Sequence, residues 1–214
     1  MAEAVESAEM ARRRPAANSI PDQSLDAERA LAFVNTLSAR PTPAPAEGLV
    51  SYDALVGWAR DQRLISTPAA ERLQAIARKH PHQAAMVLSR ARDLREALHG
   101  VIAAIEADRP LPAGALDTLG RSLAAAYAHG RLVPHDGGLQ WTYEGDDDLD
   151  RVVWEIAHAT GRLVLSPRLA RVRACAAGDC GWWFLDETKN RSRRWCDMKI
   201  CGNREKLRRF RNKS

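Results

Sequence analysis

The sequence predicts a mainly α-helical protein: a helical N-terminal body with one small β-hairpin, followed by a C-terminal module made of a hairpin and a helix. Apolar residues recur at helical spacing through most of the first 167 residues, where alanine, the strongest helix former, is abundant. All four cysteines, by contrast, lie within residues 175–201. We therefore expect three parts: a polar, disordered tail at 1–23, a helical domain at 24–167, and a cysteine-bearing module at 168–214.

Caps and apolar spacing define the helices of the body. Ser51 is placed to cap a short helix, and Thr67 followed by Pro68 begins another, which stops at His80–Pro81. The longest helix is expected over about 82–107. Its apolar residues follow steps of four and three, which place them on one face that packs into a bundle: Val87, Ala91, Leu94, Leu98, Val101 and Ile105.

Further helices are expected over 26–39 and 113–128, and the pattern then changes. Residues 131–143 alternate as in a β-hairpin, with the turn at Asp136–Gly137, a dipeptide that favours tight hairpin turns. Helical spacing returns at 149–156, after an acidic run that favours a helix start.

The four cysteines form two pairs with the spacing C-x4-C, Cys175 with Cys180 and Cys196 with Cys201, separated by fifteen residues. Two such pairs are typical of a zinc site in which each tight loop presents two thiolates to one ion. Four sulfur ligands fill a tetrahedral zinc shell and leave no position for water or substrate, so the expected single zinc ion is structural. The alternative is a pair of disulfides.

Residues 201–204 spell CGNR and follow the basic run 192–196, SRRWC. This stretch closely resembles the CGNR zinc finger. In that family the finger ends a chain whose larger N-terminal part is the ABATE domain, and residues 31–37, LAFVNTL, are similar to the motif that opens this domain. Ala32 stands where the family usually has Asp, and residues 94–98 fit the family's central helix. The resemblance implies a stress-induced transcriptional regulator.

The resemblance also implies a sensing role for the body, and hence a small-molecule effector. Four residues of the body are candidates for lining its site: Phe33, Asn35, Thr36 and Arg95. Asn35 and Thr36 lie among apolar neighbours, where polar groups need partners. The alternative interpretation is that these polar residues satisfy groups within the fold itself.

The charge is divided unevenly along the chain. Residues 168–214 carry 14 Lys or Arg and 5 Asp or Glu, a net +9, whereas residues 1–167 have a net −4. A basic module on an acidic body suggests an anionic partner for the module alone, which we expect to be DNA, with RNA or a ribosome as the alternative. A solvated basic tail is the third interpretation.

Within the module we expect an apolar strand at 182–185 to pair with a basic strand at 191–195, and a helix to begin near Asn203. Leu207 and Phe210 are expected to pack inward on this hairpin. The candidate nucleic-acid contacts lie on the basic strand and on the helix: Arg191, Arg193, Arg194, Arg204, Lys206, Arg208, Arg209 and Arg211.

The sequence contains none of the usual catalytic or phosphate-binding motifs and no run of 18 apolar residues. The N-terminal residues have no apolar core of a signal peptide. We therefore expect a cytoplasmic, non-enzymatic protein without a membrane span. An enzyme that acts through the helical body is the remaining alternative, and the oligomeric state is not predicted.

Overall fold

A computed structural model of the chain describes residues 23–135, 137–143 and 147–211. The fold is mainly α-helical, as predicted. The expected tail at 1–23 lies outside the described residues except for Gln23, which begins the first helix. The helices of the body are α2 (Gln23–Val34), α3 (Tyr52–Asp61), α4 (Thr67–Lys79), α5 (Pro81–Glu106), α6 (Ala113–His129) and α7 (Arg151–Val164).

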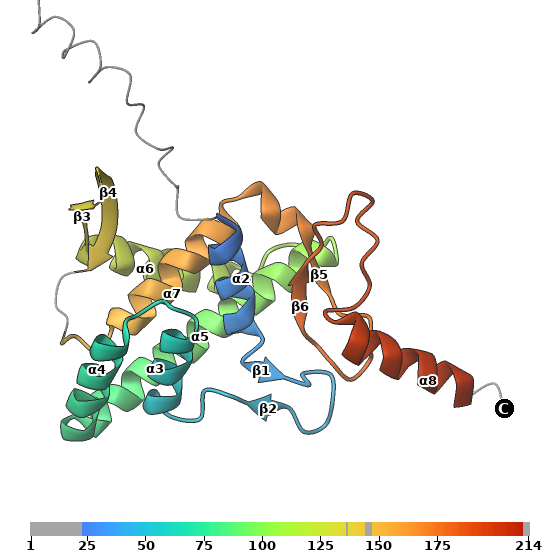
Figure 1. The fold of residues 1–214 in the computed structure, drawn as a ribbon, viewed down its shortest axis with the longest axis horizontal. Coiled ribbons are helices and arrows are strands. Elements are labelled where there is room, and N and C mark those ends of the chain that lie inside the picture. Colours follow the sequence, from blue (N-terminus) through green and yellow to red (C-terminus); the bar gives the residue numbers. More distant parts are fainter. Residues whose placement is uncertain (1–22, 136, 144–146, 212–214) are drawn as a thin grey trace, which may run out of the picture.

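The long helix α5 runs through the centre of the molecule, and α2, α3, α4, α6 and α7 all pack against it (Figure 1). The predicted apolar face of α5 is confirmed from Val87 to Val101, where all five of its residues are buried, whereas Ile105 at the end of the helix is 38% exposed. Leu94 and Leu98 are fully buried and lie at the heart of the core. The apolar residues of α5 are thus buried wherever a neighbouring helix covers this face.

The predicted caps are found at or beside their expected positions. Ser51 accepts a hydrogen bond from the backbone N–H of Ala54 at 3.1 Å, as expected of an N-cap. For α4 the cap is Ser66, one residue before the expected start, which accepts from the backbone of Ala69. Both hydroxyls satisfy N–H groups that have no partner inside the helix.

Two small antiparallel hairpins belong to the body. The predicted one is formed by β3 (Gly130–His135) and β4 (Gly138–Tyr143), with Gly137 at φ +75° in the turn; Asp136 lies outside the described residues. The other joins β1 (Leu37–Ser38) to β2 (Ala46–Glu47) around a proline-rich segment.

The C-terminal module consists of a 3₁₀ turn η1 (Pro167–Arg171), the strands β5 (Val172–Ala174) and β6 (Trp183–Leu185), a π-helical turn η2 (Met198–Gly202) and the helix α8 (Asn203–Arg211). Figure 1 shows β5, β6 and α8 at one end of the molecule and the β3–β4 hairpin at the opposite end.

The hairpin of the module differs from the expected one. β6 pairs with β5, with Val172 opposite Leu185, and the segment 191–195 is not a strand. The reason is Asp186, whose buried carboxylate accepts hydrogen bonds from the backbone N–H groups of Thr188 and Arg193 and from the Thr188 hydroxyl. These bonds fold the basic segment into a loop around Asp186, so that it does not pair with β6 as a strand.

The expected inward packing of Leu207 and Phe210 is wrong. Their side chains are 61% and 74% exposed, and no described residue of α8 is buried. The helix follows η2, its main packing neighbour, and points away from the body (Figure 1).

The strands of the module share the hydrophobic core of the body. Val172, Trp183 and Leu185 are buried in the same cluster as Leu94 and Leu98. The body and the module thus share one core, and the division of the chain into two domains between residues 167 and 168 stays a prediction. Among the described residues, no helix has the length and apolar character needed to cross a membrane.

Candidate metal centre and basic surface

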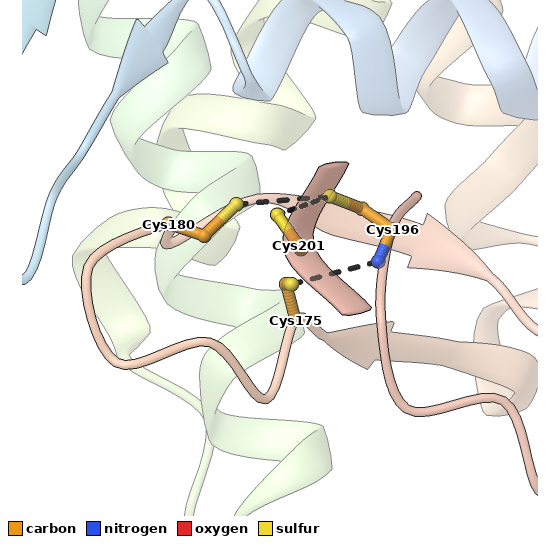
Figure 2. Close-up of side chains that lie close together, drawn as sticks. All are labelled: Cys175, Cys180, Cys196 and Cys201. Carbon is orange, nitrogen blue, oxygen red and sulfur yellow. Dashed lines mark hydrogen bonds between the residues drawn. The ribbon is translucent and has the colours of Figure 1, made fainter. Parts of the chain in front are cut away.

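The four cysteine side chains converge on one point. Their Sγ atoms all lie within 4.8 Å of one another, and the closest pairs, Cys180–Cys196 and Cys196–Cys201, are 3.7 and 3.6 Å apart (Figure 2). Sulfurs at the corners of a tetrahedron, each about 2.3 Å from a central ion, are about 3.8 Å apart. The cluster therefore matches the size of a four-thiolate metal site, and this donor set suits a soft or borderline ion.

Hydrogen bonds to backbone groups hold the two cysteine loops in place. The N–H of Cys175 donates to the carbonyl of Trp182 at 2.8 Å, which closes the loop of the first pair at the end of the β5–β6 ladder. In the second pair, Asp197 caps η2 by accepting from the N–H of Ile200 at 2.9 Å, and this tight turn brings Cys201 back toward Cys196. The sulfurs are thus fixed by two loops that are themselves tied to backbone.

All four cysteines are free thiols, and no pair has the roughly 2.05 Å separation of a disulfide. Burial, reinforced by neighbouring thiols, raises the pKa of Cys196 above its ordinary value, and burial raises the pKa of Cys201 to about 11. Cys196 and Cys201 therefore resist ionisation unless a cation balances their charge, whereas hydrogen bonds from neighbouring groups outweigh burial and lower the pKa of Cys175.

Two of the basic candidates are engaged around the metal centre. The guanidinium of Arg204 lies 2.8 Å from the carboxylate of Asp179 and 3.5 Å from the sulfur of Cys201. Arg193 stacks over the ring of Phe184 at 4.7 Å and donates to the carbonyls of Trp195 and Cys196. Both side chains hold together the loops that carry the sulfurs.

The other basic candidates are exposed. Arg208 forms ion pairs with Asp179 and Glu205, and Arg194 lies over the Trp195 ring at 5.3 Å. Among the described residues, no ion pair engages the remaining four, which are Arg191, Lys206, Arg209 and Arg211. They remain available to an external anion.

The four candidate ligand-binding residues occupy different environments. Phe33 is fully buried in the core, with its ring 5.5 Å from that of Trp58. Arg95, only 3% exposed, forms a two-bond ion pair with Glu47 at 2.7 and 2.6 Å and also bonds Thr36 and Glu96. Arg95 is therefore saturated by the fold.

Asn35 links the body to the module. Its side-chain amide donates to the carbonyl of Trp183 at 2.9 Å and its amide oxygen accepts from the N–H of the same residue at 2.8 Å. The Asn35 side chain thus occupies the free edge of β6 as a neighbouring strand would. A second tie runs from the N–H of Ala39 to the carbonyl of Cys180 at 3.0 Å.

A cavity of about 580 Å³ lies where the body meets the module. Asn35 and Thr36 line it, together with Trp58 of α3 and Trp182 and Cys196 of the module. Two of the four candidate residues are thus brought together at one cavity, while the other two stabilise the surrounding fold.

The sequence interpretation missed two residues of the metal centre. Asp179 binds both Arg204 and Arg208, and Asp197 caps η2. The signal for Asp197 was present, because Asp directly before a turn is a preferred N-cap. No sequence pattern pairs Asp179 with arginines more than twenty residues away.

A family profile, the ABATE domain, described as "Putative stress-induced transcription regulator", matches residues 27–195, most of the chain. No curated protein shows significant similarity to the chain. The matched family is described as a regulator and not as an enzyme, in line with the sequence expectation. The profile match and the cysteine cluster at 175–201 agree with the resemblance found in the sequence. The chain therefore belongs to the ABATE family, with a four-cysteine cluster consistent with a CGNR-type zinc finger.

Proposed function

We propose that this protein is a zinc-dependent, DNA-binding transcription regulator whose helical body senses a small molecule. Cys175, Cys180, Cys196 and Cys201 would hold one zinc ion, which would supply a structural cross-link between the two cysteine loops. The closed sulfur set leaves no place for a substrate at the metal. The metal centre therefore serves to position the basic surface.

One observation carries the proposal: α8 is a strongly basic helix that has no buried residue and projects from the metal centre. Burial cannot stabilise a helix of this kind, and its cations repel one another. Its nine residues extend about 13 Å at 1.5 Å per residue. A helix of this size fits the major groove of B-form DNA, where phosphates on both sides neutralise its charges.

The arrangement of side chains around α8 suits a groove. At 100° per residue, Leu207 and Phe210 share one face, with Arg211 flanking it on one side and Lys206 on the other. Arg209 lies beyond Lys206. With the apolar face toward the base edges, the flanking cations would face the two phosphate backbones, and Leu207 and Phe210 would contact apolar groups such as the thymine methyl.

The proposal is tested by a salt titration of binding to duplex DNA, single-stranded DNA and structured RNA. Each phosphate neutralised on duplex DNA contributes about −0.9 to the log–log slope of affinity against salt. The double variant Arg209→Ala/Arg211→Ala should therefore bind more weakly to all sequences, with a slope flatter by about 2.

The matched control is Arg78→Ala/Lys79→Ala, which removes the same charge from exposed positions on α4 in the body. Its slope should equal that of wild type. Binding that is tighter to structured RNA than to duplex DNA would favour the RNA alternative, with Trp182, 42% exposed, available to stack on bases. Absence of binding to all three at low salt would contradict a nucleic-acid function.

A further inference from the structure

The cavity between the body and the module has the size and lining of a small-molecule site. Its volume of about 580 Å³ falls within the range usual for such sites. The apolar part of its wall comes from Leu31 and Ala32 of α2, Trp58 of α3, and Trp182 and Phe184 of the module. Side chains from segments about 150 residues apart in the sequence thus line one open cavity.

The polar groups around this cavity fall into two classes. The side chains of Asn35 and Thr36 are already hydrogen-bonded within the protein. Within the described part of the chain, by contrast, no hydrogen bond or ion pair engages the carboxylate of Glu28 or the side-chain amide of Gln62. Glu28 lies on α2 and Gln62 directly follows α3, and these two groups are the polar partners left for a ligand.

The charge of the lining favours a cation. Glu28 contributes an unpaired negative charge, whereas the charge of Glu187 is balanced by Arg168 at 3.0 Å. Arg193, the one cation among the described lining residues, is already held by two main-chain carbonyls and the Phe184 ring. The faces of the tryptophan rings in the wall would also attract an organic cation.

We propose that this cavity binds an organic cation with an aromatic or apolar body, and that the bound molecule holds the module against the body. The ring would lie between the tryptophan-bearing walls, and the ammonium group would bond Glu28 and Gln62. Because Arg193 and Cys196 line the same cavity, the ligand would contact both the helical body and a loop of the metal centre. Binding of the ligand would therefore favour retention of the metal. Any effect of the ligand on DNA binding rests on the proposed function, whereas ligand binding itself does not.

Isothermal titration calorimetry with two matched probes tests the ligand class. Tryptamine carries an ammonium group on an indole, and indole-3-propionate carries a carboxylate on the same ring and a chain of similar length. Tryptamine should bind the full-length, metal-loaded protein with one site per chain, and indole-3-propionate should bind at least tenfold more weakly. Equal affinity for the two probes, or no heat from tryptamine at millimolar concentration, would overturn the proposed ligand.

Three variants locate the site. Ala32→Phe fills the cavity and should abolish tryptamine binding, while an unchanged melting temperature and circular dichroism spectrum show that it folds. Glu28→Gln removes an exposed charge and should weaken binding about threefold to fivefold, the scale of a partly exposed ion pair. Glu71→Gln, an exposed acid on α4, is the matched control and should bind as wild type does.

The link to the metal centre has its own readout. With tryptamine at saturation, the transfer of metal to an added chelator should slow severalfold in wild type and should not change in Ala32→Phe. Tryptamine binding that survives in Ala32→Phe would place the site elsewhere and overturn the proposal. None of these measurements involves DNA, so failure here leaves the proposed DNA binding untouched, and failure of DNA binding leaves this site untouched.

Discussion

Replacing Asn35 by alanine tests how strongly the body holds the module. Asn35 is the residue whose side chain pairs with both the N–H and the carbonyl of Trp183, at 2.8 and 2.9 Å. The substitution removes both bonds at once and leaves the edge of β6 without its neighbour. The Asn35→Ala variant keeps the helix α2 intact, because Asn35 follows its last residue, Val34.

The expected cost follows from the two bonds. A hydrogen bond contributes about 1 kcal/mol net, and a main-chain group left unpaired in a partly buried position costs about as much or more. Two bonds of this kind give about 2–3 kcal/mol of lost unfolding free energy. For a chain of this size, 1 kcal/mol corresponds to about 2–4 °C, so the melting temperature should fall by about 4–12 °C.

The measurement is urea unfolding of the metal-loaded protein followed by far-ultraviolet circular dichroism, with Asn190→Ala as control. Asn190 is an exposed residue of the basic loop, and its replacement should change stability by less than about 0.5 kcal/mol. A loss in the Asn35→Ala variant no larger than in this control would refute the reasoning. It would mean that water replaces the lost bonds and that β6 is held by apolar packing alone.

Three further outcomes follow from the structure. Cys201→Ser should lose the bound metal, measured by elemental analysis, and expose the following helix to proteolysis, whereas protein purified without chelator and found metal-free would contradict the site. Glu47→Gln should cost about 1.5–3 kcal/mol, the range for a hydrogen bond to a charged group, because it removes one charged partner of Arg95 while Glu96 and Thr36 stay bonded to it. A hydrogen bond from Arg95 lowers the pKa of Glu47 below its ordinary 4.5, so this stabilisation is present above that pH and is lost as pH falls through the lowered value. The melting temperature of wild type should accordingly drop more steeply below pH 4.5 than that of Glu47→Gln. Parallel curves of melting temperature against pH would contradict this role of the ion pair. Gly181→Ala should destabilise the protein by about 2 kcal/mol in thermal unfolding, because its φ is +70° and the added Cβ would lie 2.7 Å from the Pro41 side chain; a neutral result would show that the loop adjusts.

Local signals explain which features could be predicted from the sequence. The apolar face of α5 and the Ser51 cap depend on residues within a turn or two of one another, and both were predicted. The spacing of the four cysteines likewise indicated a cluster, which the structure places within 4.8 Å. In each case the informative residues are close in sequence.

The features that were not predicted depend on distant residues. The bond between Asn35 and Trp183 spans 148 positions, and no pattern around either residue indicates the other. The apolar residues of β6 indicate a strand but not its partner, and the choice of β5 follows from how Asp186 folds the basic loop. Phe210 looked like a core residue by spacing, but a helix face is buried only where another surface reaches it.

The exposure of α8 has a consequence for how this protein can change. A residue outside the core is not constrained by the need to fill a space, so substitutions at exposed positions of this helix away from the metal centre should leave the rest of the chain folded. Selection can then act on these positions for their interactions alone, independently of the core that carries the helix. A library randomised at Lys206, Leu207, Arg209, Phe210 and Arg211 should yield folded proteins with an altered preference for binding partners. The body and the metal centre should be the same in all of them.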